Sequence, residues 1–299
     1  MSNPLTKSQF DSIIRNNVLK HSGLKSSPFF EAKDGEKAYT NYYNDNAFDE
    51  FCDSMQNNYP KAFEAYKYGP GKEMDKRPPA PAKMASVASS SRFCYLALRD
   101  GAQVLGLKGT PIFEKACAIK GLVPVTQATP DAFFEENNTY FEVKCHEIFD
   151  PQKKFKDKYR SLLLNNYKAF GFKKELFKPI EGPDDFILDL FGDKHATIKL
   201  FDLKQFICHL IGIASNKDAN TKATLIYLFF KPKSAKYTVE LENLFDELEQ
   251  EIHMVFDNKH IKSFIRMNNI SLKAYAECDY IMKAISQDNL VKLYQGIAY

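Results

Sequence analysis

Residues 129–147 read TPDAFFEENNTYFEVKCHE, and this stretch decides the fold that we expect. Two strand-like runs, 131–135 and 139–145, flank the pair Asn137-Asn138. Asn tolerates a positive φ, so this pair suits a two-residue hairpin turn. In the resulting register, residue 136 pairs with 139, 134 with 141, 133 with 142, and 131 with 144.

The predicted hairpin has one polar and one apolar face, because strand side chains alternate between faces. Asp131, Glu142 and Lys144 share the polar face, which we expect to lie outside the apolar core. The apolar side chains of Phe134, Phe141, Val143 and Cys145 share the other face.

The polar face can hold a divalent cation. Mg²⁺ is bound by one or two carboxylates together with waters and phosphate oxygens, and Asp131, Glu142 and the Val143 carbonyl offer such oxygens. Lys144 beside the metal would orient the water that attacks phosphorus. A simpler interpretation is a cross-strand ion pair between Asp131 and Lys144, worth ~0.2–1 kcal/mol, which leaves Glu142 unexplained.

The remaining chain supplies helices and a further strand. Apolar residues at helical spacing predict helices over 92–105, with Ser89 as N-cap, and over 200–214. The apolar, β-rich run 223–230 predicts a strand buried on both faces. Residues 112–120 predict another strand, although the preceding Thr110-Pro111 would also suit the start of a helix. The order predicts an α/β protein with a small mixed sheet.

Four regions follow from composition. Residues 1–68 are mostly helical, and 69–86 form a Pro/Gly-rich linker or surface arm. Residues 87–235 form the core, and 236–299 form a helical region packed on it.

The motif Pro130-Asp131 followed by Glu142-Val143-Lys144 resembles that of the PD-(D/E)xK nuclease superfamily. The predicted order also resembles its αβββαβ core, the restriction endonuclease-like fold, over residues 87–231. The resemblance implies that Asp131 and Glu142 are metal ligands, that Lys144 is the catalytic lysine, and that Mg²⁺ is the cofactor, for which Mn²⁺ can substitute.

The same resemblance implies three further site residues. Many members carry an upstream Glu, and Glu114 is the nearest here, although the superfamily often places it in the first helix. Some branches have a Glu just after the lysine and a Gln on the second helix, and Glu147 and Gln205 occupy those places. Gln205 would position Lys144 or the metal-bound water.

Three polar residues, Asp202, Gln205 and His209, form a stripe on the helix predicted over 200–214. The stripe suits either a satisfied polar face or the role of Gln205 given above. We interpret His146 as hydrogen-bonded or solvent-facing rather than as a metal ligand.

A basic segment follows the hairpin. Residues 150–178 contain nine Lys and Arg against three Asp and Glu, whereas the whole chain has a net charge of only +3. Aromatic residues are interleaved, so the segment suits a phosphate backbone with rings that stack on bases, or equally a solvated helix with core aromatics. The nucleic-acid-binding candidates are Lys153, Lys154, Lys156, Lys158 and Arg160.

Composition narrows the class of protein. No apolar run approaches the ~20 residues of a membrane-spanning helix, and the N-terminus has no signal-like stretch. The six cysteines contain no Cys-x-x-Cys pair, so we expect buried thiols rather than a zinc site or disulfides. A cytoplasmic protein is expected, and a homodimer is left open.

These features predict a Mg²⁺-dependent nuclease that hydrolyses phosphodiester bonds, most plausibly in DNA, in a restriction or defence role. The alternative is a nucleic-acid-binding or scaffold protein that keeps the fold without turnover.

Overall fold

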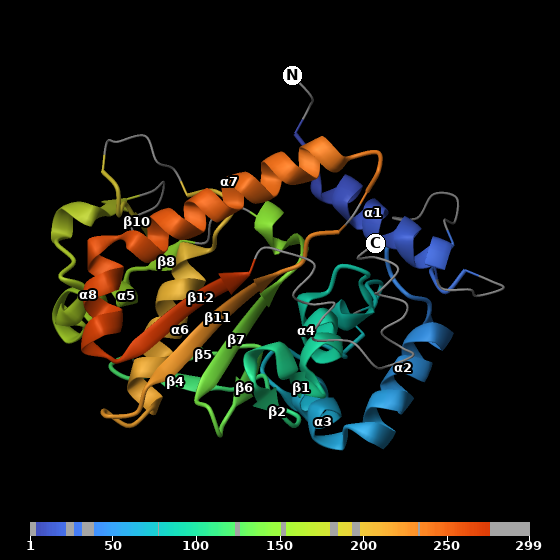
Figure 1. Cartoon of the computed structure of the whole chain (residues 1–299), viewed down its shortest axis with the longest axis horizontal. Coiled ribbons are helices and arrows are strands. Elements are labelled where there is room, and N and C mark those ends of the chain that lie inside the picture. The colour runs from blue at the N-terminus through green and yellow to red at the C-terminus, as the bar shows by residue number, and fades with distance from the viewer. Residues whose placement is uncertain are drawn as a thin grey trace.

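The computed structural model describes residues 4–21, 27–31, 39–76, 78–122, 126–150, 154–179, 185–192, 198–232 and 234–275. Its centre is a five-stranded sheet with the strand order β12-β11-β7-β6-β3 (Figure 1). These strands are β3 (Ile112–Phe113), β6 (Ala132–Phe134), β7 (Thr139–Lys144), β11 (Ala223–Phe229) and β12 (Ile270–Tyr275). Strand β11 runs parallel to β7 and β12, whereas β6 runs antiparallel to β7 and β3. The protein is therefore mixed α/β, as the sequence predicts.

Helices surround this sheet (Figure 1). They are α1 (Lys7–His21), α2 (Asp45–Asn58), α3 (Pro60–Tyr68), α4 (Ser90–Leu98), α5 (Lys158–Ser161), α6 (Leu203–Asn216), α7 (Thr238–Asp257) and α8 (Lys259–Met267). The Ser89 side chain caps α4 by accepting the Arg92 N–H at 3.2 Å, as predicted. The helix predicted over 92–105 ends at Leu98, because Gly101 takes a φ of 96° that no right-handed helix allows.

Short strands outside the central sheet form three small sheets. They are β1 (Gly101–Ala102) with β2 (Leu107–Lys108), β4 (Cys117–Ile119) with β5 (Thr126–Ala128), and β8 (Phe155–Lys156) with β10 (Asp185–Leu188) and β9 (Phe177–Pro179). The single strand predicted over 112–120 is therefore divided between β3 and β4. Glu114, with a φ of 52°, turns the chain between the two.

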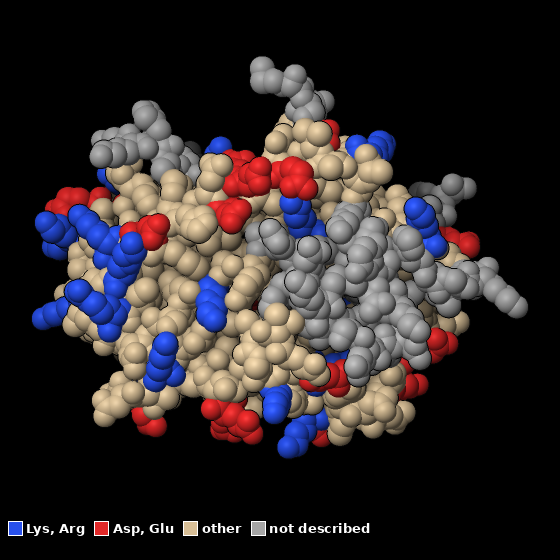
Figure 2. Space-filling view, viewed as in Figure 1, with Lys and Arg blue, Asp and Glu red and all other residues tan. Residues whose placement is uncertain are grey.

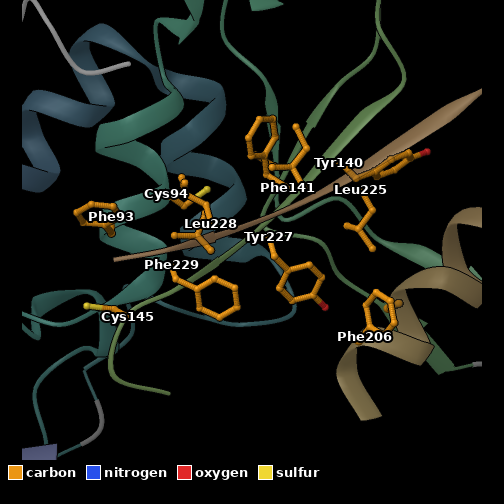
Figure 3. Packing of buried hydrophobic residues seen from close by; sticks show 14 of the residues in the cluster. Phe93, Cys94, Tyr140, Phe141, Cys145, Phe206, Leu225, Tyr227, Leu228 and Phe229 are labelled. Carbon is orange, nitrogen blue, oxygen red and sulfur yellow. The ribbon is translucent and has the colours of Figure 1, made fainter. Parts of the chain in front are cut away.

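The central strands β7 and β11 are buried on both faces. Tyr227 and Leu228 are consecutive in β11 and so point to opposite faces of the sheet. Phe206 of α6 lies on the Tyr227 side, and Cys94 of α4 lies on the Leu228 side (Figure 3). This double cover explains the apolar run of β11 and confirms its predicted burial.

The flanking regions differ from prediction in two places. Met74, Ala82 and Met84 are buried, so residues 69–86 pack against the core instead of forming a surface arm. The C-terminal region contains α7 and α8, but it also supplies the edge strand β12, which sequence periodicity did not indicate. Residues 276–299, including Cys278, lie outside the described residues.

Four of the five described cysteines are buried, and all five are free thiols. Within the described ranges, no helix combines the length and the apolar character needed to cross a bilayer.

Candidate functional site

The hairpin pairs β6 with β7 in a register two residues away from the predicted one. Ala132 lies opposite Phe141, and residues 135–138 make the turn, whose first carbonyl accepts the Asn138 N–H at 3.1 Å. A two-residue turn of the expected kind needs a positive φ at both positions. Of the two predicted turn residues only Asn138 has one, 47°, and the loop is therefore longer.

The shift changes which residues are opposed but not which face they occupy. Continued by one pair, the register places Asp131 opposite Glu142 instead of Lys144. Because side chains alternate with a period of two, a two-residue shift keeps Asp131, Glu142 and Lys144 on one face. The predicted one-face arrangement therefore stands, and the predicted pairing of Asp131 with Lys144 was wrong.

The three side chains meet at the end of β7. Lys144 Nζ lies 2.6 Å from Glu142 Oε1, and the Val143 N–H donates to Asp131 Oδ2 at 2.6 Å. The Glu142 side chain is 1% exposed and that of Lys144 is 12% exposed. The polar face is thus covered, contrary to the expectation that it would lie outside the core.

A buried histidine that the sequence did not assign to the site completes the surroundings of Glu142. His209 Nε2 of α6 lies 3.5 Å from Glu142 Oε2, and His209 Nδ1 lies 3.2 Å from the Tyr227 hydroxyl. Glu142 Oε2 itself is buried and accepts no hydrogen bond from the described residues. Only the polar stripe on α6 hinted at His209, because its meeting with Glu142 depends on how α6 packs on the sheet.

Glu114 adds another carboxyl group to this cluster. Its backbone N–H donates to the Asp131 carbonyl at 3.0 Å, and the Gly71 backbone hydrogen-bonds its carboxylate. A Cβ at residue 71 would lie 2.9 Å from Glu114 Oε2 and 2.5 Å from Glu73 Oε1, so glycine leaves room for both carboxylates. The structure therefore places Glu114 beside Asp131, although from a loop and not from the first helix.

Crowding of like charges marks the cluster. Burial, with the neighbouring charge of Glu142, raises the pKa of Asp131 well above its ordinary value. Burial, Glu73 and Glu142 raise the pKa of Glu114 to about 7. Burial lowers the pKa of Lys144, but the carboxylates of Glu142, Glu147 and Asp131 outweigh it and raise that pKa. The site therefore holds more carboxylates than its ammonium group compensates.

The two remaining predicted site residues have different surroundings. Glu147 Oε2 accepts the Cys145 N–H at 2.8 Å, and despite burial the charge of Lys144 helps to lower the pKa of Glu147. Gln205 lies one helical turn before His209 on α6, and its Oε1 is buried without a hydrogen-bond partner among the described residues. Glu147 is therefore within electrostatic reach of Lys144, and Gln205 shares a helix face with His209.

His146 is hydrogen-bonded, as we interpreted it. Its Nδ1 lies 2.7 Å from Asp11 Oδ1 of α1, which ties the end of the hairpin to the N-terminal helix. Asp202 caps α6 by accepting the Gln205 N–H at 2.9 Å.

The basic segment differs from the surface that the sequence suggested. Lys154, Lys156 and Lys158 are exposed, Arg160 is half-buried, and Lys153 lies outside the described residues. Lys156 pairs with Asp185 at 3.0 Å and Arg160 with Asp157 at 2.8 Å, while Lys158 donates to Thr126. The interleaved rings Phe155, Tyr159, Phe170 and Phe172 are buried, so they belong to the core and cannot stack on bases.

No family model, curated protein or solved structure matches this chain. Among the described residues, no group of three or more His, Cys, Asp and Glu side chains is arranged to hold a metal ion.

Glu114 makes the stability of the metal-free protein depend on pH. Its pKa is about 7 when folded and about 4.5 when unfolded, so the folded state binds more protons between these values and stability falls as pH rises through them. Glu114→Gln should therefore raise the free energy of unfolding by ~3 kcal/mol at pH 8 but by only ~1 kcal/mol at pH 5.5. Urea unfolding in EDTA at both pH values measures this. Glu136→Gln, in the exposed hairpin turn, serves as control. An equal increase in the free energy of unfolding of Glu114→Gln at both pH values would contradict a raised pKa of Glu114.

Proposed function

We propose that this chain is a divalent-metal-dependent nuclease, and that Asp131, Glu142 and Lys144 form its catalytic centre. The observation that carries the proposal is the convergence of Asp131 and Glu142 on one sheet face beside Lys144, with Glu142 Oε2 buried and without a hydrogen bond from any described residue. His209 Nε2, 3.5 Å away, makes no hydrogen bond to this oxygen, and a buried acceptor without a hydrogen bond is costly unless a cation satisfies it. The order α4, β3, β6, β7, α6 and β11 supports a restriction endonuclease-like core.

The donor set suits Mg²⁺. Asp131 and Glu142 offer hard oxygen ligands, and Mg²⁺ needs only one or two protein carboxylates in addition to waters and phosphate oxygens. The Val143 carbonyl points to the same strand edge as the Val143 N–H, which donates to Asp131, and so adds an oxygen on that side. A three-carboxylate cage is not required, although Glu114 stands close to Asp131.

Each residue has a distinct role in this proposal. Asp131 and Glu142 would hold the ion, which when bound supplies charge neutralisation at phosphate and a more acidic water. Lys144, held at 2.6 Å from Glu142, places its ammonium group where it can orient the attacking water and stabilise negative charge at phosphorus. Glu147 holds a compensating charge near Lys144. Gln205, whose buried Oε1 has no hydrogen-bond partner in the described ranges, would position the water or Lys144.

His209 is expected to position Glu142, because its Nε2 faces the carboxylate oxygen and the Tyr227 hydroxyl faces its other nitrogen. His209→Leu should weaken Mn²⁺ binding 10–100-fold, the usual effect of removing the partner of a metal ligand. His209→Gln, which retains a donor, should recover part of that loss. Calorimetric titration with Mn²⁺, alongside thermal unfolding, separates this role from loss of the fold. Unchanged affinity in folded His209→Leu would contradict it.

The experiment that tests the proposal is a cleavage assay. Purified protein is incubated with duplex DNA, single-stranded DNA and RNA in Mg²⁺, in Mn²⁺ and in EDTA, and products are resolved on gels. We expect cleavage, most plausibly of DNA, with either metal and none in EDTA. Binding without cleavage under every metal condition would reject the catalytic role.

A second candidate is a nucleic-acid-binding or scaffold protein without turnover. The Lys144–Glu142 ion pair favours it, because this pair already satisfies one carboxylate oxygen without a metal. We prefer the nuclease because, within the part of the chain that the structure describes, the other oxygen of Glu142 accepts no hydrogen bond.

A further inference from the structure

Two segments far apart in the sequence form one unit beside the central sheet. His260 Nδ1 of α8 lies 2.7 Å from the Phe170 carbonyl in the turn Lys168–Phe170. The rings of Phe170 and Phe264 stack with centroids 3.9 Å apart, and both rings are fully buried. Helix α8 and residues 168–174 are therefore held together by a hydrogen bond and a packed aromatic contact.

The outer side of this unit is basic. Six exposed side chains form what we call the α8 basic surface: Lys168, Lys173, Lys174, Lys259, Lys262 and Arg266. Figure 2 shows Lys and Arg gathered at the left edge of the molecule, where Figure 1 places α8. Within the described part of the chain, only Lys262 of the six has an ion pair, with Asp257 at 2.9 Å.

Charge on the molecule is segregated, although its total is only +3. A single residue separates helix α7 from α8, and the exposed charge of α7 is negative. Its exposed acidic side chains include Glu242, Asp246, Glu247 and Glu249, and Figure 2 shows red atoms along the top, where α7 runs. Asp257 and the exposed Glu175 compensate only part of the positive charge of the α8 basic surface. A mostly basic surface next to an acidic helix attracts an anionic partner to one defined side of the molecule.

The chemistry of the surface distinguishes among anionic partners. Single-stranded nucleic acid is bound through exposed aromatic rings, and protein interfaces through apolar or aromatic anchors. Here Phe170 and Phe264 are buried, and Met267 is the only large hydrophobic residue that α8 exposes. Cations without exposed rings are what the phosphate backbone of a duplex requires.

We propose that the α8 basic surface binds the phosphate backbone of a nucleic-acid duplex. This inference rests on the proposed function, because it names the form of the nuclease substrate. It also adds contacts to those of the segment 153–160, where Lys154 and Lys158 are exposed and Lys156 and Arg160 are paired with carboxylates.

The test measures binding of a fluorescent 30-base-pair DNA duplex in EDTA between 50 and 200 mM KCl. The variant Lys259→Gln/Lys262→Gln/Arg266→Gln should lower the magnitude of the slope of log K against log salt by roughly 2–3, since each phosphate contact contributes about 0.9. The matched control Lys61→Gln/Lys67→Gln/Lys108→Gln removes three exposed lysines elsewhere and should leave the slope unchanged. Lys259→Arg/Lys262→Arg retains the charges and should retain the slope.

Three results would overturn the inference. The first is equal slopes for the α8 triple variant and wild type. The second is that the α8 triple variant loses binding to polyglutamate but keeps its binding to the duplex, which would indicate an acidic protein partner. The third is tighter, equally α8-dependent binding of single-stranded DNA. Binding is measured in EDTA, which prevents cleavage, so the two proposals can fail separately. A lowered slope for the α8 triple variant of a protein that never cuts with Mg²⁺ would reject the nuclease activity but support this surface. Cleavage with Mg²⁺ together with an unchanged slope would support the activity but reject this surface.

Discussion

Asp131→Asn is expected to reduce metal-dependent cleavage to background while the protein stays folded. Asparagine keeps the volume of the side chain, and its amide oxygen can still accept the Val143 N–H. The substitution removes the negative charge that would hold the cation, and with it the charge neutralisation that phosphate attack requires. Because burial and Glu142 raise the pKa of Asp131, the neutral variant should also be more stable than wild type in EDTA at pH 8.

Cleavage assays with Mg²⁺ and Mn²⁺, together with urea unfolding in EDTA, check both parts of this expectation. Asp246→Asn removes an exposed carboxylate on α7 that is not part of the proposed site, and it serves as the matched control. A variant that retains a tenth or more of wild-type cleavage would show that Asp131 does not hold the metal.

Lys144→Ala is expected to lower cleavage by 10²–10⁴-fold, the usual contribution of a positioned proton-transfer or water-orienting group. It should also destabilise the metal-free protein by about 3 kcal/mol, because it leaves Glu142 buried without its ammonium partner. The sequence alone placed Lys144 on a polar face outside the apolar core, where its replacement would not unfold the protein. The double variant Lys144→Ala/Glu142→Gln should recover part of the stability but none of the activity.

The chain offers a matched ion pair as control. Lys231 lies 2.6 Å from Glu242, and that carboxylate is exposed on α7. Lys231→Ala should therefore cost less than ~1 kcal/mol and leave cleavage unchanged. Similar losses of stability for the two alanine variants, measured by urea unfolding, would contradict a special role for the buried pair.

The elements with strong periodicity could be predicted from the sequence. The apolar run of β11 and the helical spacing of α6 belong to buried elements, where packing requires the same pattern that intrinsic preference favours. Strand β12 carries no such signal, because only Ile270 of its six residues is buried at the sheet edge. The division of 112–120 into two strands depends on the positive φ of Glu114. A positive φ is uncommon for a non-glycine residue, so the sequence gives no reason to expect it.

The sequence could predict which residues share the candidate site, but not which other residues surround and bury them. The period of two fixes the shared face of Asp131, Glu142 and Lys144 even though the register was displaced by two residues. Burial of that face depends on α6 packing against it, as the 3.5 Å approach of His209 to Glu142 shows. The basic surface of α8 likewise depends on contact between segments some ninety residues apart in sequence, as the bond from His260 to Phe170 shows.

The central claim is that Asp131 and Glu142 share a divalent cation. A crystal structure of the wild-type protein grown with Mn²⁺ and measured at an anomalous wavelength tests it most directly. We predict an anomalous peak bonded to one carboxylate oxygen of each residue, with Lys144 beside it, and no such peak in Asp131→Asn crystals grown identically. A wild-type map without a peak there at saturating Mn²⁺, with Lys144 still bound to Glu142, would contradict the claim.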